Sequence, residues 1–259
     1  MTPVIPVTAL EALWAFDAIE LDELQADAAL RTRVDRKYML DWDTFTSVAR
    51  TLRGSHRALE IDGGRAFRYE TVYFDSARLG AFRAHMQRRR RRYKVRSRRY
   101  VDSDLHFFEI KLKGARGETI KHQLPYGPDD HGLVTDAARA FLADQLSEAY
   151  PRMDVPALAP TVITDYRRLT LAGYGERVTV DFGLRFSDEA SAVDGLDRGH
   201  VILESKCERG LGAADRQLRR LGVAPVTCSK YCVGIGLLRD DVKVNDLRWL
   251  LSRYFHAHA

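Results

Sequence analysis

The chain has 259 residues, of which 45% are hydrophobic and 30% charged, and its formal net charge is +5. This composition excludes a chain that is disordered as a whole, and the basic balance points to an anionic partner. No apolar run approaches the roughly 18 residues of a membrane span, and residues 1–10 lack the basic start and long apolar stretch of a secretion signal, so we expect a cytoplasmic protein.

The first half of the chain predicts helices followed by a group of strands. Residues 10–30 carry apolar residues at helical spacing, which predicts a helical N-terminal region. Polar residues at its start and Gly54, which would end it, predict a helix over 43–52. Next come a strand at 67–74, a helix at 77–87, strands at 92–101 and 105–113 joined by a turn at 102–104, and a strand at 118–124.

The second half mixes strands and helices in the same way. A helix is predicted over 132–149, and the Pro-containing stretch PRMDVPALAP follows it. We interpret this stretch as a crossover inside one fold, because the strands after it repeat the pattern of those before it. These later elements are strands at 161–172, 177–186 and 200–206, a helix at 213–221, and a last helix from about Ser229.

Several predicted strands place charged side chains on one face and apolar side chains on the other. In Phe107–Lys113, strict alternation puts Glu109, Lys111 and Lys113 on one face. A half-buried strand whose polar face meets water gives the same pattern, but its repetition with mostly Lys and Arg favours a basic surface that holds a polyanion. The other sets are Lys94, Arg96 and Arg98; Arg177, Thr179 and Asp181; Glu204 and Lys206; and Arg33, Asp35 and Lys37.

A series of motifs follows the order and rough spacing of a known family. The motifs are RVDRKY, YETVYFDS, RYKVRSRRY, FFEIKLK, the later Lys121, TDYRRL, RVTVDF, LESK and SKY. No single motif is decisive. The ordered set resembles the VTC domain, a polyphosphate polymerase domain of the triphosphate tunnel metalloenzyme (CYTH-like) superfamily, from about Arg31 to Leu238.

The resemblance implies an α+β fold, in which an antiparallel β-barrel forms a tunnel and helices pack on its outside. It also implies a helical segment over residues 1–30, the tunnel domain over 31–240, and a C-terminal tail or helix over 241–259. If basic side chains point into a barrel, the apolar faces point outward and must be covered by helices, so the physical interpretation agrees.

The resemblance also implies which residues bind substrate and metal. Glu204 in LESK is the metal ligand that the motif indicates, with Glu109, Asp181 and Asp35 as assisting ligands. Mn²⁺ or Mg²⁺ is the expected cation, since hard cations prefer oxygen ligands. Tyr166, Ser229 and Lys94 are implied as substrate-binding neighbours. The catalytic, phosphate-binding set is Lys37, Arg96, Arg98, Lys111, Lys121, Arg168 and Lys230.

One position departs from the wider superfamily. The superfamily carries a first strand of the type ExExK, whereas this chain has Arg33, Asp35 and Lys37 at those places. Loss of one carboxylate favours a single catalytic metal over a pair. The polymerase branch shares this departure, which argues mildly against a plain triphosphatase.

The expected reaction is phosphoryl transfer, in which positioning and charge stabilisation carry most of the catalysis. We place a polymerase first, which moves the γ-phosphate of ATP to a polyphosphate chain. A triphosphatase, which moves it to water, and a non-catalytic polyphosphate- or nucleic-acid-binding protein remain the alternatives. No GxxxxGK[ST] motif occurs, which argues against a P-loop enzyme. The product chain length, the regulator and the oligomeric state stay open.

Arg88–Arg92 is a run of five arginines. Such a run is most often a solvated face or a nucleic-acid contact. The neighbouring aromatic residues, Tyr93, Tyr100, Phe107 and Phe108, alternate as barrel wall does, so we place RNA or DNA behind phosphate compounds as the partner. At a tunnel mouth, these arginines would draw in ATP or guide the product.

Overall fold

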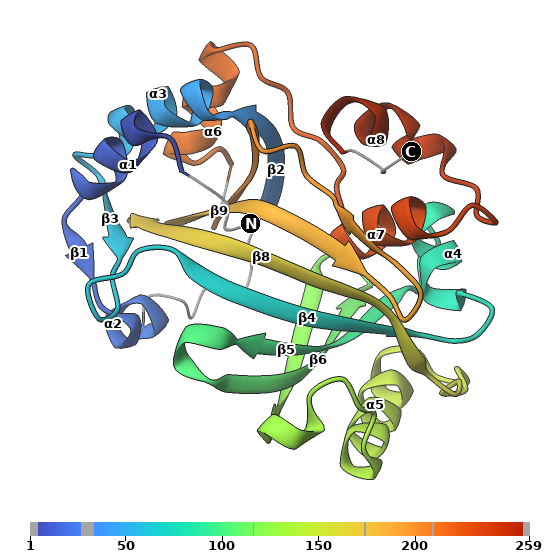
Figure 1. Ribbon diagram of the computed structural model, residues 1–259. Coiled ribbons are helices and arrows are strands. Elements are labelled where there is room, and N and C mark those ends of the chain that lie inside the picture. The colour runs from blue at the N-terminus through green and yellow to red at the C-terminus, as the bar shows by residue number, and fades with distance from the viewer. Residues whose placement is uncertain (1–4, 27–33, 116, 174, 209, 256–259) are drawn as a thin grey trace. The chain divides into compact units, whose positions relative to one another are not determined.

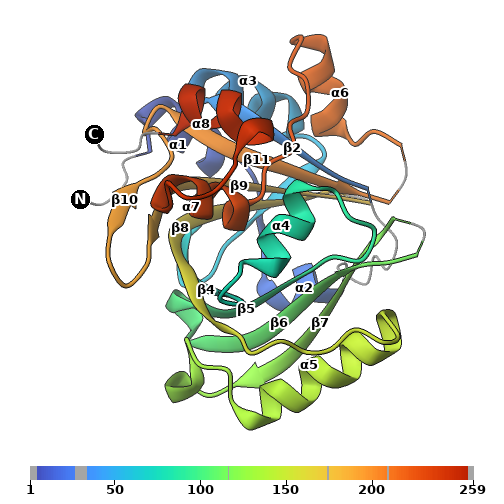
Figure 2. The same ribbon diagram turned by 90° about the vertical axis from the view of Figure 1, so that its right-hand side faces the viewer.

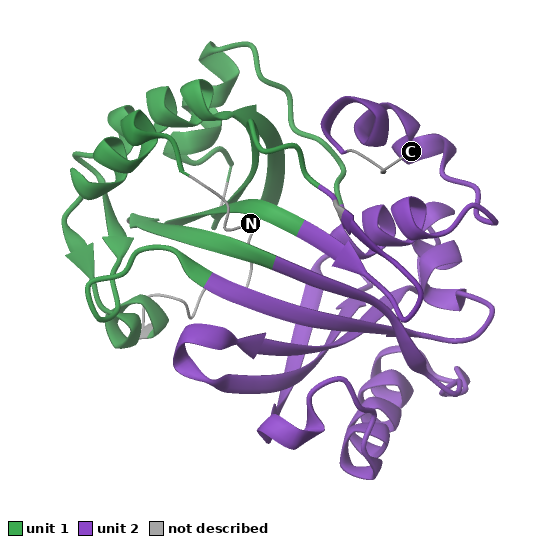
Figure 3. Ribbon diagram, in the orientation of Figure 1, with its two compact units in different colours: residues 1–67, 166–184, 196–228 green, residues 68–165, 185–195, 229–259 purple. Residues whose placement is uncertain are grey.

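The computed structural model describes residues 5–26, 34–115, 117–173, 175–208 and 210–255. Arg33 lies outside this set, as does the end of the predicted N-terminal helical region. The chain divides into two compact units, each assembled from three separate stretches of sequence (Figure 3). Unit 1 consists of residues 1–67, 166–184 and 196–228, and unit 2 of residues 68–165, 185–195 and 229–259.

Unit 1 is built on an antiparallel sheet in the order β2-β11-β9-β8. The short strand β3 (His56–Leu59) pairs with the end of β8 and also pairs, in parallel, with β1 (Ala18–Ile19). The four main strands are β2 (Val34–Asp41), β11 (His200–Cys207), β9 (Glu176–Ser187) and β8 (Ala159–Gly173), and the last two also extend into unit 2.

Three helices of unit 1 pack on one face of this sheet, namely α1 (Val7–Trp14), α3 (Trp42–Leu52) and α6 (Ala213–Arg220) (Figure 1). Their apolar sides meet alternate strand residues in one core, which includes Leu40, Phe45, Val48, Leu203 and Leu218. Helix α3 begins where the Asp41 carboxylate accepts a hydrogen bond from the Thr44 amide at 2.7 Å. A further short helix, α2, covers Leu21–Ala26.

Unit 2 is built on an antiparallel meander, with the first half of β8 next to β4. Its strands are β4 (Phe67–Asp75), β5 (Tyr93–Tyr100), β6 (Leu105–Lys113) and β7 (Thr119–Tyr126). The long helix α5 (Asp136–Ala149) lies against this sheet (Figure 2) and buries Leu142 and Leu146 against Phe74, Phe108 and Ile110. Unit 2 also contains α4 (Gly80–Met86), β10 (Ala192–Asp194), α7 (Lys230–Leu238) and α8 (Arg248–Tyr254).

The predicted α+β class, with an antiparallel sheet and helices packed on its outer side, is confirmed. Strand pairing does not close the sheet into a ring: in the described part of the chain, β2 pairs with β11 alone and β7 with β6 alone. No helix among the described residues is long and apolar enough to cross a membrane. The segment bounds at residues 30 and 240 remain predictions.

Most predicted elements agree with the structure within two residues, but two predicted helices were too long. The N-terminal helical region contains α1 and α2, with β1 between them. The helix expected at 77–87 begins at Gly80, because Leu79 has a left-handed backbone with φ of 52°. The helix expected from 132 begins at Asp136, where the Thr135 hydroxyl caps the Ala138 amide. Strands β1, β3 and β10 were not predicted.

Candidate functional site

In each unit, one face of the sheet is covered by helices and the other face carries charged side chains. In unit 1, the alternation that sends Leu40 and Leu203 into the core sends the intervening residues to the second face. We call this set the unit 1 charged face. It consists of Asp35 and Lys37 on β2, Glu204 and Lys206 on β11, Arg177, Thr179 and Asp181 on β9, and Tyr166 and Arg168 on β8.

Glu204 lies in the middle of this face, directly opposite Lys37 on one side and Thr179 on the other. Its carboxylate is 3.5 Å from the Lys206 ammonium, and both side chains are about one-seventh exposed, at 15% and 14%. The Lys37 ammonium donates to the Cys228 carbonyl at 2.7 Å. Glu204 is therefore a partly accessible carboxylate bordered by two lysines.

Asp181 and Arg168 form a two-fold ion pair between β9 and β8. The Arg168 guanidinium donates to the two Asp181 oxygens at 2.6 and 2.8 Å, and the Asp181 side chain is 1% exposed. The Arg168 guanidinium also lies 5.5 Å from the ring centre of Tyr166, a fully buried side chain. Both Asp181 oxygens are thus engaged in fixing the orientation of Arg168.

Asp35 lies one row away from Glu204. The strand register places Asp35 opposite Lys206, which in turn lies opposite Arg177. The Arg177 guanidinium donates to the Leu24 carbonyl at 2.9 Å. The three charged side chains therefore form a separate row at the end of the face.

The residues around Glu204 fit a divalent cation by their chemistry. Thr179 is 3% exposed, and its hydroxyl makes no hydrogen bond within the described residues. A buried hydroxyl without a partner costs roughly 1–3 kcal/mol, so this atom is suited to a bound group. The described residues contain no cluster of three or more His, Cys, Asp or Glu arranged for a metal. One carboxylate with water and substrate phosphates is a common magnesium site.

Unit 2 carries its own charged face, opposite α5. Lys94 on β5, Lys111 on β6 and Lys121 on β7 are direct cross-strand neighbours, and we call them the lysine row. Side chains in such positions have Cβ atoms about 5 Å apart, and like charges there are destabilising. The unit 2 basic face consists of these lysines with Arg96, Arg98, Glu109, Gln123, Thr71 and Tyr73.

Glu109 is the buried carboxylate of this face. Arg96 is its direct neighbour on β5, donates to it from Nε at 2.5 Å and forms a second, closer contact from Nη2. Gln123 donates to its other oxygen at 2.7 Å, and the Lys121 ammonium lies 3.7 Å away. Burial raises the pKa of Glu109, but the charges of Arg96, Arg98, Lys121 and Lys111 outweigh burial and hold the pKa well below its usual range.

The second buried arginine, Arg98, is held by β4. Its Nε donates to the Thr71 hydroxyl at 3.1 Å, and its guanidinium lies 5.6 Å from the Tyr69 ring centre. Tyr73 lies next to Thr71 on the same face, and the charges around it change its pKa. Burial raises the Tyr73 pKa, but Arg96, Arg98 and Lys230 together lower it below its usual value. The net positive charge of this face therefore exceeds the effect of burial.

Lys230 is the first residue of α7, and its position depends on a buried contact made by Tyr231. The Tyr231 hydroxyl donates to Asp75, whose carboxylate also accepts from the Ala81 and Phe82 amides at 3.0 and 2.9 Å. Burial and the Asp75 charge raise the pKa of Tyr231, which stays a donor. Ser229 caps α7, its hydroxyl accepting from the Cys232 amide at 3.4 Å.

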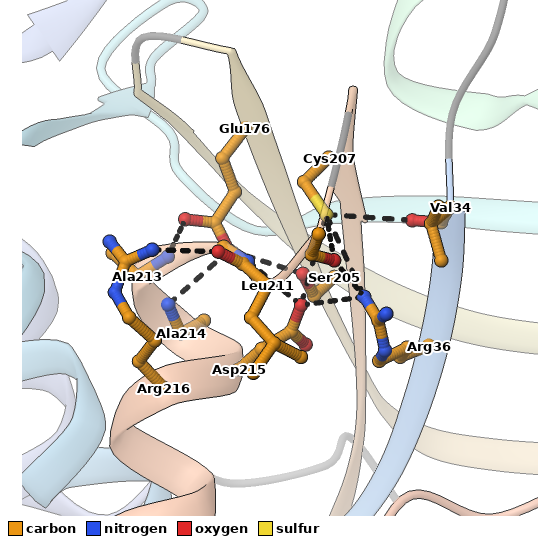
Figure 4. Close-up of polar contacts among 12 residues, drawn as sticks. Val34, Arg36, Glu176, Ser205, Cys207, Leu211, Ala213, Ala214, Asp215 and Arg216 are labelled. Carbon is orange, nitrogen blue, oxygen red and sulfur yellow. Dashed lines mark hydrogen bonds and ion pairs between the residues drawn. The ribbon is translucent and has the colours of Figure 1, made fainter.

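Two buried carboxylates on the helix-covered face of unit 1 are structural. Glu176 accepts hydrogen bonds from the Ala213 amide at 2.6 Å and the Ser205 hydroxyl at 3.1 Å. Asp215 accepts from Arg36 at 3.1 Å (Figure 4). It also accepts from the Tyr38 hydroxyl at 2.9 Å. These contacts attach the start of α6 to β2, β9 and β11.

The structure thus groups the predicted site residues in two sets. Unit 2 brings together Lys94, Arg96, Arg98, Glu109, Lys111 and Lys121, with Lys230 near enough to lower the Tyr73 pKa. Unit 1 brings together Lys37, Glu204, Arg168 and Asp181, with Asp35 one row away. Sequence reasoning missed Thr71, Tyr73, Gln123 and the role of Thr179 beside Glu204, although alternation in YETVYFDS marks the first two.

Comparisons with known proteins give low identities to solved structures. A Bacillus halodurans protein, described as a candidate adenylate cyclase, is 13% identical, with 76% of this chain and 94% of that chain covered and a TM-score of 0.48. A Hippeastrum protein with a dominant triphosphatase activity is 12% identical, with coverage of 81% and 98% and a TM-score of 0.48. The S. pombe RNA triphosphatase is 8% identical, with coverage of 85% and 86% and a TM-score of 0.28.

A search of curated proteins found no match. The family comparison is more informative than the solved structures, whose identities and TM-scores assign no function to this chain. The model of the VTC domain matches residues 32–239, which is more than half of the chain and contains both charged faces. The chain therefore belongs to the VTC domain family.

Proposed function

We propose that the protein is a metal-dependent phosphotransferase that moves the γ-phosphate of ATP to the end of an inorganic polyphosphate chain. The observation that carries this proposal is the lysine row, continued by Arg96 and Arg98. Five basic side chains on the unit 2 basic face accompany one carboxylate, Glu109. A chain of phosphates is the ligand that offers many closely spaced negative charges to such a surface.

The two kinds of basic side chain have different expected roles. Arg96 and Arg98 are oriented by Glu109 and Thr71, so each presents donors in a fixed direction. Fixed guanidinium groups suit the equatorial oxygens of the transferred phosphoryl group, where charge builds up in the transition state. The lysines carry a compact charge on a flexible stem, and they suit the phosphates on either side.

A divalent cation, Mg²⁺ or Mn²⁺, would neutralise phosphate charge when bound, and the Glu204 carboxylate with the Thr179 hydroxyl are the groups we expect to hold it. Lys37 and Lys206 border Glu204 and would bind phosphate oxygens beside it. The side chains of each charged face are suited to orienting phosphates and to stabilising charge, and we assign none of them as a covalent nucleophile.

The first test is incubation of the purified protein with ATP and Mn²⁺ or Mg²⁺, with ADP, long-chain polyphosphate and free phosphate measured together. Polyphosphate formed with ADP is the expected result. Free phosphate alone would make the protein a triphosphatase, because the same side chains can place a water molecule as acceptor. Absence of both products, with retained binding of tripolyphosphate, would leave a polyphosphate-binding protein and overturn the proposal.

Glu204→Gln is the matched variant for this test. It keeps the size of a side chain that is largely buried but removes the carboxylate charge. We expect turnover to fall by at least about a hundredfold, the order of loss seen when a metal ligand or its support is removed. Tripolyphosphate binding without metal should be retained. Normal turnover in this variant would show that Glu204 does not hold the cation.

A further inference from the structure

The loop between α4 and β5 carries the run Arg88–Arg92. Arg88 to Arg91 are exposed and Arg92 is half-buried. In the described part of the chain, these five guanidinium groups make one ion pair, between Arg88 and Asp246 at 3.5 Å, and both of its side chains are mostly exposed, at 79% and 56%. The loop is therefore a concentrated positive charge at the surface of unit 2.

The backbone of this loop is held in place. Arg88 has a left-handed conformation with φ of 51°, its amide donates to the His85 carbonyl at 3.1 Å, and the Arg89 amide donates to the Ala84 carbonyl at 2.9 Å. These bonds end α4 and fix the direction of the chain. The Arg92 guanidinium then donates back to the Arg89 carbonyl at 2.5 Å. The arginines are thus displayed from an ordered turn.

The loop continues the unit 2 basic face. The Lys113 amide donates to the Arg92 carbonyl at 3.1 Å, which places Arg92 and Lys113 one row beyond the lysine row. The Tyr150 hydroxyl fixes this row, since it accepts from the Lys113 amide and lies 2.8 Å from the Arg92 carbonyl. Rows in a strand are spaced by roughly 6.5 Å, within the reach of a long basic side chain.

Positive charge is therefore arranged along one path. From the Arg98 row it runs through the Arg96 row, where Glu109 supplies a counter-charge, to the lysine row, then to Arg92 and Lys113, and finally to the loop. His85 lies near two residues of this path, Lys94 and Arg92. Burial lowers the pKa of His85 to about 3, with Lys94 and Arg92 adding to the effect.

We propose that the Arg88–Arg92 loop is an outer binding track for inorganic polyphosphate, which holds phosphates beyond those bound on the unit 2 basic face. The inference rests on the proposed function, since it assumes that the face binds a phosphate chain. A polyphosphate chain requires only spaced cations, whereas RNA requires stacking surfaces beside them. Tyr93, the aromatic residue that follows the loop in the chain, offers no such surface, because it is buried in the α5 core.

The test compares ligands of two lengths. The variant Arg89→Ala/Arg90→Ala/Arg91→Ala removes three exposed charges from the loop. The dissociation constants of tripolyphosphate and of long-chain polyphosphate are measured by calorimetry at two salt concentrations. We expect long-chain affinity to fall by about tenfold or more with a weaker salt dependence, since fewer counterions are released. Tripolyphosphate affinity should change less than twofold.

The matched control is Arg50→Ala/Arg53→Ala/Arg220→Ala, which removes the same charge from exposed positions in α3, directly after α3 and in α6. It should leave both affinities nearly unchanged. Equal losses of affinity for the two ligands, or equal losses of affinity in the two variants, would overturn the inference. Either result would indicate that the net charge of the protein, and not this loop, attracts the polyphosphate. Unchanged long-chain binding in the loop variant would overturn it as well.

Two further outcomes separate this inference from the proposed function. If the unaltered protein binds no tripolyphosphate, the proposed function fails along with the track. If it binds tripolyphosphate and makes polyphosphate while the loop variant keeps full long-chain affinity, the track alone fails. A labelled single-stranded RNA serves as competitor. RNA that binds more tightly than polyphosphate, and is lost in the loop variant, would assign the loop to RNA and overturn the inference.

Discussion

Arg96 and Glu109 face each other across β5 and β6 as a buried ion pair, and Glu109 is the carboxylate within a group of basic side chains. The arrangement explains how one sheet keeps so much positive charge. Glu109 offsets part of the repulsion and also fixes the direction of Arg96. In the proposed function, the remaining charge binds the phosphate chain.

Glu109→Gln should destabilise the protein strongly, because removing one partner of a buried ion pair leaves the other uncompensated. The expected loss is about 3–5 kcal/mol in the free energy of unfolding, measured with urea. Tripolyphosphate should recover more stability in the variant than in the unaltered protein, since it replaces the missing negative charge. Glu118→Gln, at an exposed position, is the control. If tripolyphosphate stabilised Glu109→Gln and the unaltered protein equally, Glu109 and the ligand would not offset the same positive charge.

The sequence predicted this face in part. Alternation with period two is local, so KVRSRRY and FFEIKLK indicated that Lys94, Arg96 and Arg98 share a face, as do Glu109 and Lys111. Which residue lies opposite which depends on strand register, which the turns and the core set together. The lysine row and the pairing of Glu109 with Arg96 therefore became visible only in the structure.

Other residues escaped prediction for different physical reasons. β1 and β3 are short. They form because β3 pairs with β8 and β1 pairs with β3, and their own residue pattern does not predict them. Glu176 and Asp215 lie on the helix-covered side of unit 1, where the alternation of the strands predicts apolar residues. They are tolerated there because they accept hydrogen bonds from backbone amides at the start of α6. The sequence could not predict that the Thr179 hydroxyl has no hydrogen-bond partner among the described residues, because this depends on which side chains lie around it in the folded protein.

His85 predicts a loss of stability at acid pH. Its pKa falls from 6.5 to about 3 in the folded protein, mainly through burial, so the unfolded chain binds one more proton between these values. Stability contributed by the neutral side chain is therefore complete above pH 6.5 and decreases as the pH falls toward 3. Urea unfolding at a series of pH values should show this slope. His85→Gln should flatten it, while His122→Gln, on β7, serves as a comparison; an unchanged slope in His85→Gln would argue against the assignment.

Thr179→Val separates metal binding from folding. The substitution keeps the shape of a buried side chain and removes a hydroxyl that has no partner within the described residues, so stability should stay equal or rise by about 1 kcal/mol. Mn²⁺ affinity, measured by titration in the presence of tripolyphosphate, should fall several-fold. Thr164→Val removes another unpaired buried hydroxyl, on β8, and should leave Mn²⁺ affinity unchanged. Equal Mn²⁺ affinities in both variants would remove Thr179 from the cation site.

Asp181 was expected to assist a metal, and its contacts favour a different role, the orientation of Arg168. A double-mutant cycle with Arg168→Ala and Asp181→Ala distinguishes the two. If the pair acts as a unit, the changes in unfolding free energy should be non-additive by about 2 kcal/mol, since either substitution already breaks both hydrogen bonds. The exposed pair Arg239 and Asp241 is the control, and its cycle should show no resolved coupling.

Arg168→Lys adds a functional measurement, because lysine keeps the charge but cannot form two parallel bonds to one carboxylate. It should lower the rate of phosphoryl transfer while leaving Mn²⁺ affinity unchanged. Additive stabilities, together with weaker Mn²⁺ binding in Asp181→Ala, would instead place Asp181 among the metal ligands.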